Sequence, residues 1–301
     1  MTKQVILSLV LLAVIVAFRV PTELPFSNLT SNALSTTRPD DEKIEPPEIE
    51  LSLEAKSVYI FDIVENKILY EKNSSAALPL ASLTKLMAAI MLEESAAGEV
   101  YIPVSKNAAS QPESEGIRAG DRFLKSDLLD IMLSASSNDA AYAAAEFLGG
   151  VDRFVGLMNA RARELGFSSL SFSNPHGLDI VTSSGRIPGA AGNAQDIARL
   201  FRYIYEKHPG MLEKTRISDF EIVSDMGRVI YAKNTNEALG DIPGLIGSKT
   251  GYTALAGGNL VFMFKTDNVH IIITSILGSS EEGRFDDARE IVNELLKYYD
   301  F

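Results

Sequence analysis

Apolar residues are densest at the start of the chain, where a run from Val5 to Phe18 is interrupted only by Ser8. At a helical rise of about 1.5 Å per residue this run spans roughly 21 Å, less than a hydrocarbon core of ~30 Å. That length is typical of a signal peptide, but the nearest small-x-small cleavage pattern, Ser31-Asn32-Ala33, lies well beyond the run. We therefore expect residues 1–20 to be a single-pass N-terminal membrane anchor, or a signal segment that is cleaved. A buried core helix is the third interpretation.

Residues 21–50 show no helical or strand period. They are rich in Ser, Thr, Asn and Pro and then become acidic, with Pro46-Pro47 near their end. Such a composition cannot bury enough apolar surface to fold. We expect a disordered extracytoplasmic linker that joins the membrane segment to a folded domain of residues 51–301.

Beyond Leu51 the apolar pattern changes to that of a folded domain. Strand patterns occur near both ends, at 57–63 with 68–71, and at 259–265 with 269–277; each pair is separated by a short polar turn typical of a hairpin. Segments with apolar residues three or four apart predict helices at 82–97, 125–134, 139–147, 151–165, 194–205 and 281–299. We expect an α+β fold in which both termini build one antiparallel sheet, with helices packed on it and a helical lobe inserted.

Composition narrows the class of protein. The chain has 301 residues, of which 46% are hydrophobic and 23% charged, as in ordinary globular proteins. Its net charge of -12 argues against a nucleic-acid partner, because phosphates attract basic surfaces. The absence of cysteine excludes thiol catalysis, disulfides and Cys-ligated zinc.

The first candidate for chemistry is the pair Ser82 and Lys85, at the start of the helix predicted after Pro79. Residues three apart share a helix face, so the lysine amine lies within reach of the serine hydroxyl. A serine hydroxyl needs an adjacent base, and a lysine serves when desolvation or nearby cations lower its pKa. For the pair taken alone, a capping serine followed by a surface lysine is the simpler interpretation.

A second pattern, Ser136-Ser137-Asn138, lies between two predicted helices, where Ser136 and Asn138 can project together. Helix capping by Ser137 or Asn138 is the alternative, and both roles are compatible. The third pattern is Lys249-Thr250-Gly251 before the late hairpin. A cation and a hydroxyl there suit a substrate carboxylate, and glycine allows a bound peptide to approach the backbone. A glycine-flanked turn is the simpler interpretation.

The order of the three patterns is more specific than any one of them. Ser-x-x-Lys is followed after about 50 residues by Ser-x-Asn, and after about 110 more by Lys-Thr-Gly. This arrangement resembles the penicillin-binding proteins and serine β-lactamases. The segments Asn174–Leu178 (Asn-Pro-His-Gly-Leu), Met132–Ala140 and Gly251–Leu260 resemble the low-molecular-mass D-alanyl-D-alanine carboxypeptidases in particular. The resemblance covers roughly residues 51–277 and implies a β-lactamase/transpeptidase-like fold.

The resemblance also implies a role for each motif residue. Ser82 is the nucleophile that forms an acyl-enzyme with a peptidoglycan stem peptide, and Lys85 is its general base. Ser136 relays a proton to the leaving D-alanine, while Asn138 binds the substrate backbone and helps to position Lys85. Further implied roles are binding of the terminal carboxylate by Lys249 and Thr250, close peptide approach at Gly251, and an oxyanion hole formed by the backbone N–H groups of Ser82 and Tyr252. β-Lactams are then expected to act as inhibitors, and no metal or other cofactor is implied.

Several alternatives stay open at this stage. A Ser-His-Asp triad would use His176 with Asp179, although a histidine that holds its own loop is the simpler interpretation; the three histidines are too scattered to suggest a metal site. A D,D-endopeptidase would use the same residues. A class A β-lactamase needs a Glu-x-x-Leu-Asn loop, which the sequence lacks before Lys249. A non-catalytic module that binds wall peptides or β-lactams is the last alternative.

Overall fold

The computed structural model describes residues 49–113, 116–266 and 269–299. The membrane or signal segment expected at 1–20 lies outside these residues, as does nearly all of the linker expected at 21–50. Among the helices of the described part, none is both long enough and apolar enough to cross a membrane.

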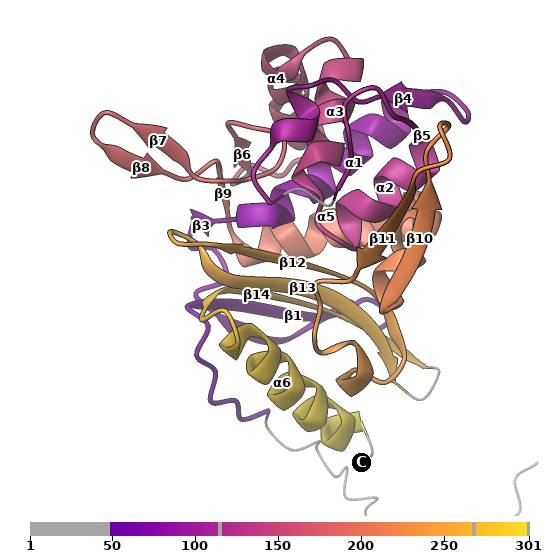
Figure 1. Cartoon of the computed structure of the whole chain (residues 1–301). Helices are drawn as coiled ribbons and strands as arrows, with labels where there is room; N and C mark the ends of the chain where they lie inside the picture. The colour runs from indigo at the N-terminus through magenta and orange to yellow at the C-terminus, as the bar shows by residue number, and fades with distance from the viewer. Residues whose placement is uncertain (1–48, 114–115, 267–268, 300–301) are drawn as a thin grey trace, which may run out of the picture. The chain divides into compact units, whose positions relative to one another are not determined.

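A five-stranded antiparallel sheet is formed from the two ends of the described chain (Figure 1). Its order is β12-β13-β14-β1-β2, so the N-terminal hairpin pairs directly with the last strand: Val58 lies opposite Ile276. The expected sheet built from both termini is therefore confirmed. Its strands are β1 (Ser57–Asp62), β2 (Lys67–Lys72), β12 (Leu245–Thr253), β13 (Gly257–Thr266) and β14 (His270–Ser279).

Helices cover both faces of this sheet, and each face has its own hydrophobic core (Figure 1). Successive strand residues point to opposite faces, so Phe262 packs toward α6 and its neighbour Met263 toward the helical lobe. Helix α6 is amphipathic and buries Ile291 and Leu295 against the sheet. The helices are α1 (Thr84–Ser95), α2 (Lys125–Leu133), α3 (Asn138–Phe147), α4 (Val151–Glu164), α5 (Ala194–Lys207) and α6 (Gly283–Tyr299).

The short elements were not anticipated by the apolar pattern, because most of their strands have only two or three residues. In the three-stranded sheet, β9 (Ala190–Gly192) is central and pairs with β3 (Leu78–Pro79) and with β6 (Ser171–Phe172). The other pairs are β4 (Tyr101–Pro103) with β5 (Arg122–Leu124), β7 (Ile180–Thr182) with β8 (Gly185–Ile187), and β10 (Asp219–Val223) with β11 (Val229–Lys233). Single 3₁₀ turns occur at Ala81–Leu83, Ala108–Ser110, Pro209–Leu212, Lys214–Arg216 and Leu239–Asp241.

The helix that carries the Ser-x-x-Lys pattern is the central helix of the lobe. Every residue of α1 from Thr84 to Leu92 is buried. The helix expected from Ser82 begins instead as the 3₁₀ turn Ala81–Leu83 and becomes α-helical at Thr84. Because α1 is surrounded by other helices, the position of its first turn is fixed by packing on all sides.

Candidate active site

Ser82 lies in a strained turn between strand β3 and helix α1. The residue before it, Ala81, has φ of 48°, a left-handed conformation that is unfavourable for any residue with a Cβ. The hydroxyl of Thr84 donates a hydrogen bond of 2.7 Å to the Ala81 carbonyl. Backbone strain of this kind persists only where the surrounding structure enforces it, and it is concentrated at functional sites.

The Lys85 amine is positioned against the Ser82 hydroxyl. Lys85 is fully buried, and its Nζ lies 2.7 Å from Ser82 Oγ, with a second hydrogen bond of 3.2 Å to the carbonyl oxygen of His176. The capped-helix alternative is not supported, because the lysine is not on the surface and the serine does not cap α1. A buried amine in direct contact with a hydroxyl is suited to accept its proton.

The second motif forms the connection between α2 and α3. Ser136 has a left-handed φ of 61°. Ser137 is the N-cap of α3, and its Oγ accepts a 3.1 Å hydrogen bond from the N–H of Ala140, so capping and a candidate catalytic role do coexist. Asn138 donates through Nδ2 to the Pro112 carbonyl at 2.8 Å, while its buried Oδ1 has no hydrogen-bond partner among the described residues. The amide therefore holds the 112–113 loop, and its proposed contact with Lys85 stays a prediction.

The third motif lies on β12, one of the two edge strands of the five-stranded sheet. Lys249 is buried, and its Nζ donates at 2.9 Å both to Ser136 Oγ and to the Thr250 carbonyl. Burial lowers the pKa of the Lys249 amine well below its usual value, and the charges of Lys85 and Arg284 lower it further. The structure thus connects the second and third motifs through one hydrogen bond.

Gly251 allows β12 to pass close to the Ser82 turn. A Cβ at this position would lie 3.1 Å from the backbone nitrogen of Ser82 and 3.0 Å from the Leu80 carbonyl. The next residue, Tyr252, is 44% exposed. Because the two backbones approach closely, Ser82, Gly251 and Tyr252 line the same cleft.

These elements enclose a cavity of about 240 Å³ at Ser82. Its lining includes Ser82, Ser136 and Thr250 from the motifs, and four polar residues that the motifs did not indicate: Glu113, Thr235, Glu281 and Arg284. The buried lysines lie behind this surface and are not part of the lining. Residues from all three motifs, with Ser82 and Thr250 168 positions apart, therefore meet at one cavity.

Arg284 is the cation that borders this cavity. It extends from the first turn of α6, is 8% exposed, and donates from Nη1 to the Gly251 carbonyl at 3.1 Å. Its Nε is buried and has no hydrogen-bond partner among the described residues. No motif marks this position in the sequence. Thr235, on the loop after β11, shares a hydroxyl–hydroxyl contact with Thr250.

The Asn174–Leu178 segment supports the Ser82 turn from behind. The Asn174 side chain bonds both the Gly177 N–H, at 2.6 Å, and the Leu178 carbonyl, at 2.8 Å. Gly177 has φ of +87°, and a Cβ there would lie 1.9 Å from the Ala81 carbonyl oxygen. The segment therefore fits only with glycine at this point of contact.

His176 holds its own loop, in agreement with the simpler interpretation. Its Nδ1 accepts a hydrogen bond from the Leu178 N–H at 3.2 Å, and burial together with the Lys85 charge lowers its pKa to about 3. Asp179 instead accepts hydrogen bonds from Thr253 and Leu255. The described contacts give no support to a triad of Ser82, His176 and Asp179.

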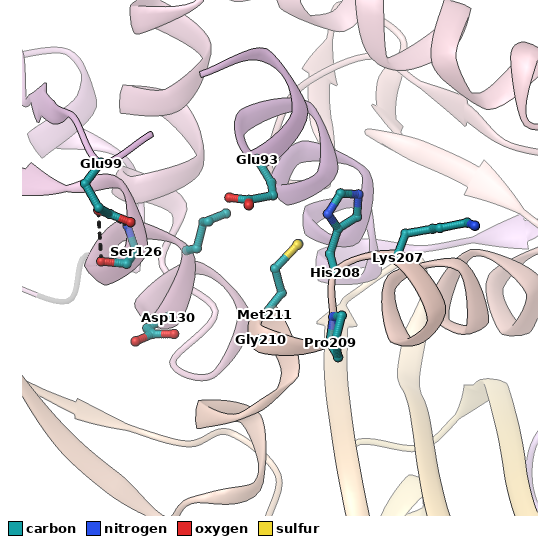
Figure 2. Close-up of a pocket in the computed structure, with 10 residues that line it drawn as sticks. Glu93, Glu99, Ser126, Asp130, Lys207, His208, Pro209, Gly210 and Met211 are labelled. Carbon is teal, nitrogen blue, oxygen red and sulfur yellow. Dashed lines mark hydrogen bonds between the residues drawn. The ribbon is translucent and has the colours of Figure 1, made fainter. Parts of the chain in front are cut away.

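Two other groups of polar side chains, one lining a cavity and one of possible metal ligands, do not contain the pairing of a serine hydroxyl with a buried lysine. A cavity of about 340 Å³ near the end of α1 is lined by carboxylates and by His208; its Ser126 hydroxyl bonds Glu99, and burial raises the pKa of Asp130 to about 7 (Figure 2). In the described residues, Asp62, Glu65 and His270 have possible ligand atoms within 4.8 Å of one another. Asp62 is already bonded to His270, Tyr299 and two backbone N–H groups, which explains this group without a metal.

Comparisons with known proteins agree with the geometry. Residues 41–280 match the sequence model of the family described as D-alanyl-D-alanine carboxypeptidase, and this chain belongs to that family. DacF of Bacillus subtilis is 30% identical over 83% of this chain and 64% of its own length. DacB2 of Mycobacterium tuberculosis is 30% identical over 76% of this chain and 77% of its own. A relative in Haemophilus influenzae, 30% identical over 70% of each chain, is named a D-alanyl-D-alanine endopeptidase.

The fold is shared with solved penicillin-binding proteins. Penicillin-binding protein D2 of Listeria monocytogenes, solved with bound ampicillin, superposes with a TM-score of 0.66 at 29% identity. The match covers 81% of this chain and 98% of that one. The predicted β-lactamase/transpeptidase-like fold is confirmed, although the chain spans less than two thirds of the length of DacF.

Proposed function

We propose that this protein is a serine-type D-alanyl-D-alanine carboxypeptidase, which removes the terminal D-alanine from peptidoglycan stem peptides and is inhibited by β-lactams. The observation that carries this proposal is the 2.7 Å contact between Lys85 Nζ and Ser82 Oγ at the base of the cavity. Family membership and the ampicillin bound to a relative support it.

In the acylation step, Ser82 Oγ attacks the carbonyl carbon between the two D-alanines and its proton passes to Lys85 Nζ. The backbone N–H groups of Ser82 and Tyr252 stabilise the negative oxygen; one such donor is worth roughly 3–4 kcal/mol in comparable enzymes. The C–N bond then breaks, and the leaving amine takes a proton from Ser136, which Lys249 replenishes through their 2.9 Å hydrogen bond. Water later hydrolyses the ester on Ser82.

The substrate carboxylate is assigned to Thr250 and Arg284, both of which line the cavity. Sequence reasoning gave this role to Lys249 and Thr250. Lys249 is buried behind the lining and is already bonded to Ser136, so we assign it to proton transfer and to the local positive field instead. Among the described residues Arg284 donates only from Nη1, to the Gly251 carbonyl, so its guanidinium has further donors for a carboxylate in the cavity that it lines.

The test uses the full-length protein with fluorescent penicillin and, separately, with diacetyl-lysyl-D-alanyl-D-alanine. Stable labelling mapped to Ser82, together with release of D-alanine, is expected. Ser82→Ala and Lys85→Ala should both lose labelling, whereas Lys106→Ala, at an exposed lysine, is the matched control. An unlabelled wild type would overturn the proposal, and rapid penicillin turnover would indicate a β-lactamase.

An endopeptidase is the second candidate, favoured by the relative that carries that name. A cross-linked peptide dimer distinguishes the two activities. Cleavage of the dimer without release of D-alanine from the tripeptide would assign the endopeptidase activity.

We also propose that the apolar run Val5–Phe18 directs the chain to the membrane, so that the catalytic domain lies outside the cytoplasm. The run ends without an adjacent cleavage pattern, which supports retention as an anchor. Cell fractionation and sequencing of the mature N-terminus test this directly. A mature chain that begins after Ala33 and is released from the membrane would replace the anchor with a cleaved signal.

A further inference from the structure

A second cavity, of about 350 Å³, continues from the one at Ser82. The two cavities share Glu113 and Tyr252. Three parts of the chain line the second cavity: Pro112-Glu113, the end of β12 with the residue after it (252–254), and the β7–β8 hairpin with the chain that enters it. That hairpin extends away from the helical lobe in Figure 1. Such a continuous cleft suits a substrate longer than the dipeptide at the scissile bond.

Both walls of the second cavity are fixed to elements already described. Asp179, at the start of the hairpin, accepts hydrogen bonds from the Thr253 hydroxyl at 3.0 Å and the Leu255 N–H at 3.3 Å. The Pro112 carbonyl accepts the 2.8 Å hydrogen bond from Asn138. The cavity is therefore preformed, and a ligand would not have to order these segments.

The cavity presents opposite charges that the described structure leaves unpaired. Arg186, on β8, makes no hydrogen bond or ion pair with another described residue, and neither does Glu113. Glu113 is also held at a left-handed φ of 59°. Val181, which is 74% exposed, adds an apolar surface to the same lining. A cation, an anion and an apolar side chain are thus offered to one ligand.

We propose that this cavity binds the side chain of the residue that precedes D-alanyl-D-alanine, and that it selects a side chain ending in an ammonium and a carboxylate on one carbon. The inference rests on the proposed function. Thr250 and Arg284 take the terminal carboxylate in the first cavity, so the peptide on the other side of the scissile bond leads into the second.

The charges of Glu113 and Arg186 determine which side chain the second cavity prefers. The ammonium of such a side chain pairs with Glu113, its carboxylate pairs with the Arg186 guanidinium, and its methylene groups contact Val181. A lysine side chain has the ammonium alone, so it leaves Arg186 without a partner. One charge-assisted contact of about 1.4 kcal/mol corresponds to a tenfold difference.

The experiment compares kcat/KM of the full-length protein for three peptides ending in D-alanyl-D-alanine. Their preceding residue is 2,6-diaminopimelic acid, lysine or Nε-acetyl-lysine. The expected order is diaminopimelic acid over lysine by about tenfold, and lysine over acetyl-lysine. Arg186→Ala should reduce the first ratio to within about twofold, Glu113→Gln should reduce the second, and Arg163→Ala, at an exposed arginine of α4, should change neither.

Equal rates for the first two peptides in the wild type, or a preference that survives Arg186→Ala, would overturn the inference. Its failure is separable from that of the proposed function. If no peptide releases D-alanine, the proposed function fails, and the concentration of each peptide that halves the rate of penicillin labelling then measures selectivity. The same order of peptides in that assay supports the inference, and equal concentrations reject it.

Discussion

The contact between Gly177 and the Ser82 turn gives the sharpest test of how the site is held. In Gly177→Ala, the new Cβ would lie 1.9 Å from the Ala81 carbonyl oxygen and 2.5 Å from Thr84 Oγ1. Neither neighbour is the free end of a flexible chain. The backbone of the Ser82 turn would have to move, and Ser82 with it.

The size of the effect follows from two contributions. A Cβ at a left-handed φ costs about 1–2 kcal/mol, and overpacking a close contact costs about 1–3 kcal/mol more. Gly227→Ala is the matched control, because Gly227 has φ of +76° with nothing within 4 Å of the new Cβ. It carries only the first cost, so Gly177→Ala should be less stable than the control by about 1–3 kcal/mol.

Two assays check this. Urea denaturation gives the free energy of unfolding of each variant. Replacing glycine by alanine changes the entropy of the unfolded chain equally in both variants, so this contribution cancels when they are compared. The rate of penicillin labelling reports the position of Ser82, and we expect it to fall in Gly177→Ala and to be retained in Gly227→Ala. Equal stabilities combined with equal labelling rates would refute the role that we give to this contact.

Three further changes have expected outcomes. Arg284→Ala should lower kcat/KM for the tripeptide about 10- to 100-fold, mainly by raising KM, because a hydrogen bond to a charged group is worth about 1.5–3 kcal/mol. Arg284→Lys should recover part of the lost kcat/KM. An unchanged KM in Arg284→Ala would contradict the assignment of Arg284 to the substrate carboxylate. His176, whose pKa is lowered to about 3, stays neutral when folded but takes a proton when unfolded below its usual pKa of 6.5. Acidification from pH 7 to 4.5 should therefore lower the free energy of unfolding, measured by urea denaturation, by about 2 kcal/mol more in the wild type than in His176→Asn. Parallel plots of unfolding free energy against pH for the two proteins would be inconsistent with this. Asp130, with its pKa raised to about 7, stabilises the fold while protonated and loses that contribution as the pH rises from 3.8 through 7. Asp130→Asn should thus gain roughly 1–2 kcal/mol over the wild type at pH 8 but not at pH 3, because solvent screens part of the shift; equal stability at both pH values would argue against the raised pKa.

The proposed role differs from the sequence-based role at one residue, Lys249. Both Lys249 and Asn138 belong to motifs; the Lys249 amine donates to Ser136 Oγ and the Asn138 amide to the Pro112 carbonyl, and the substrate contacts expected of both residues stay predictions. A motif fixes which chemical groups are present and not which neighbour each group reaches. The direction of a long lysine side chain depends on what the rest of the fold places around it.

The sequence by itself determined the long elements and the order of the motifs. Helix α6 and strands β13 and β14 were predictable, because each has ten residues or more over which the 3.6- or 2-residue apolar period can be read. The contact of Lys85 with Ser82 also follows from local spacing, since residues three apart share a helix face. The short hairpins β7–β8 and β10–β11 were missed because strands of three to five residues give too few positions for a period.

Only the tertiary structure decided which distant groups share the cleft. Arg284 reaches Gly251 because α6 starts beside the edge strand β12, and no local pattern around residue 284 contains that information. Glu113 and Arg186 line one cavity for the same reason, as their segments are separated by three helices in the chain. Such placements arise from long-range packing and strand pairing, whereas periodicity and spacing act over a few residues only.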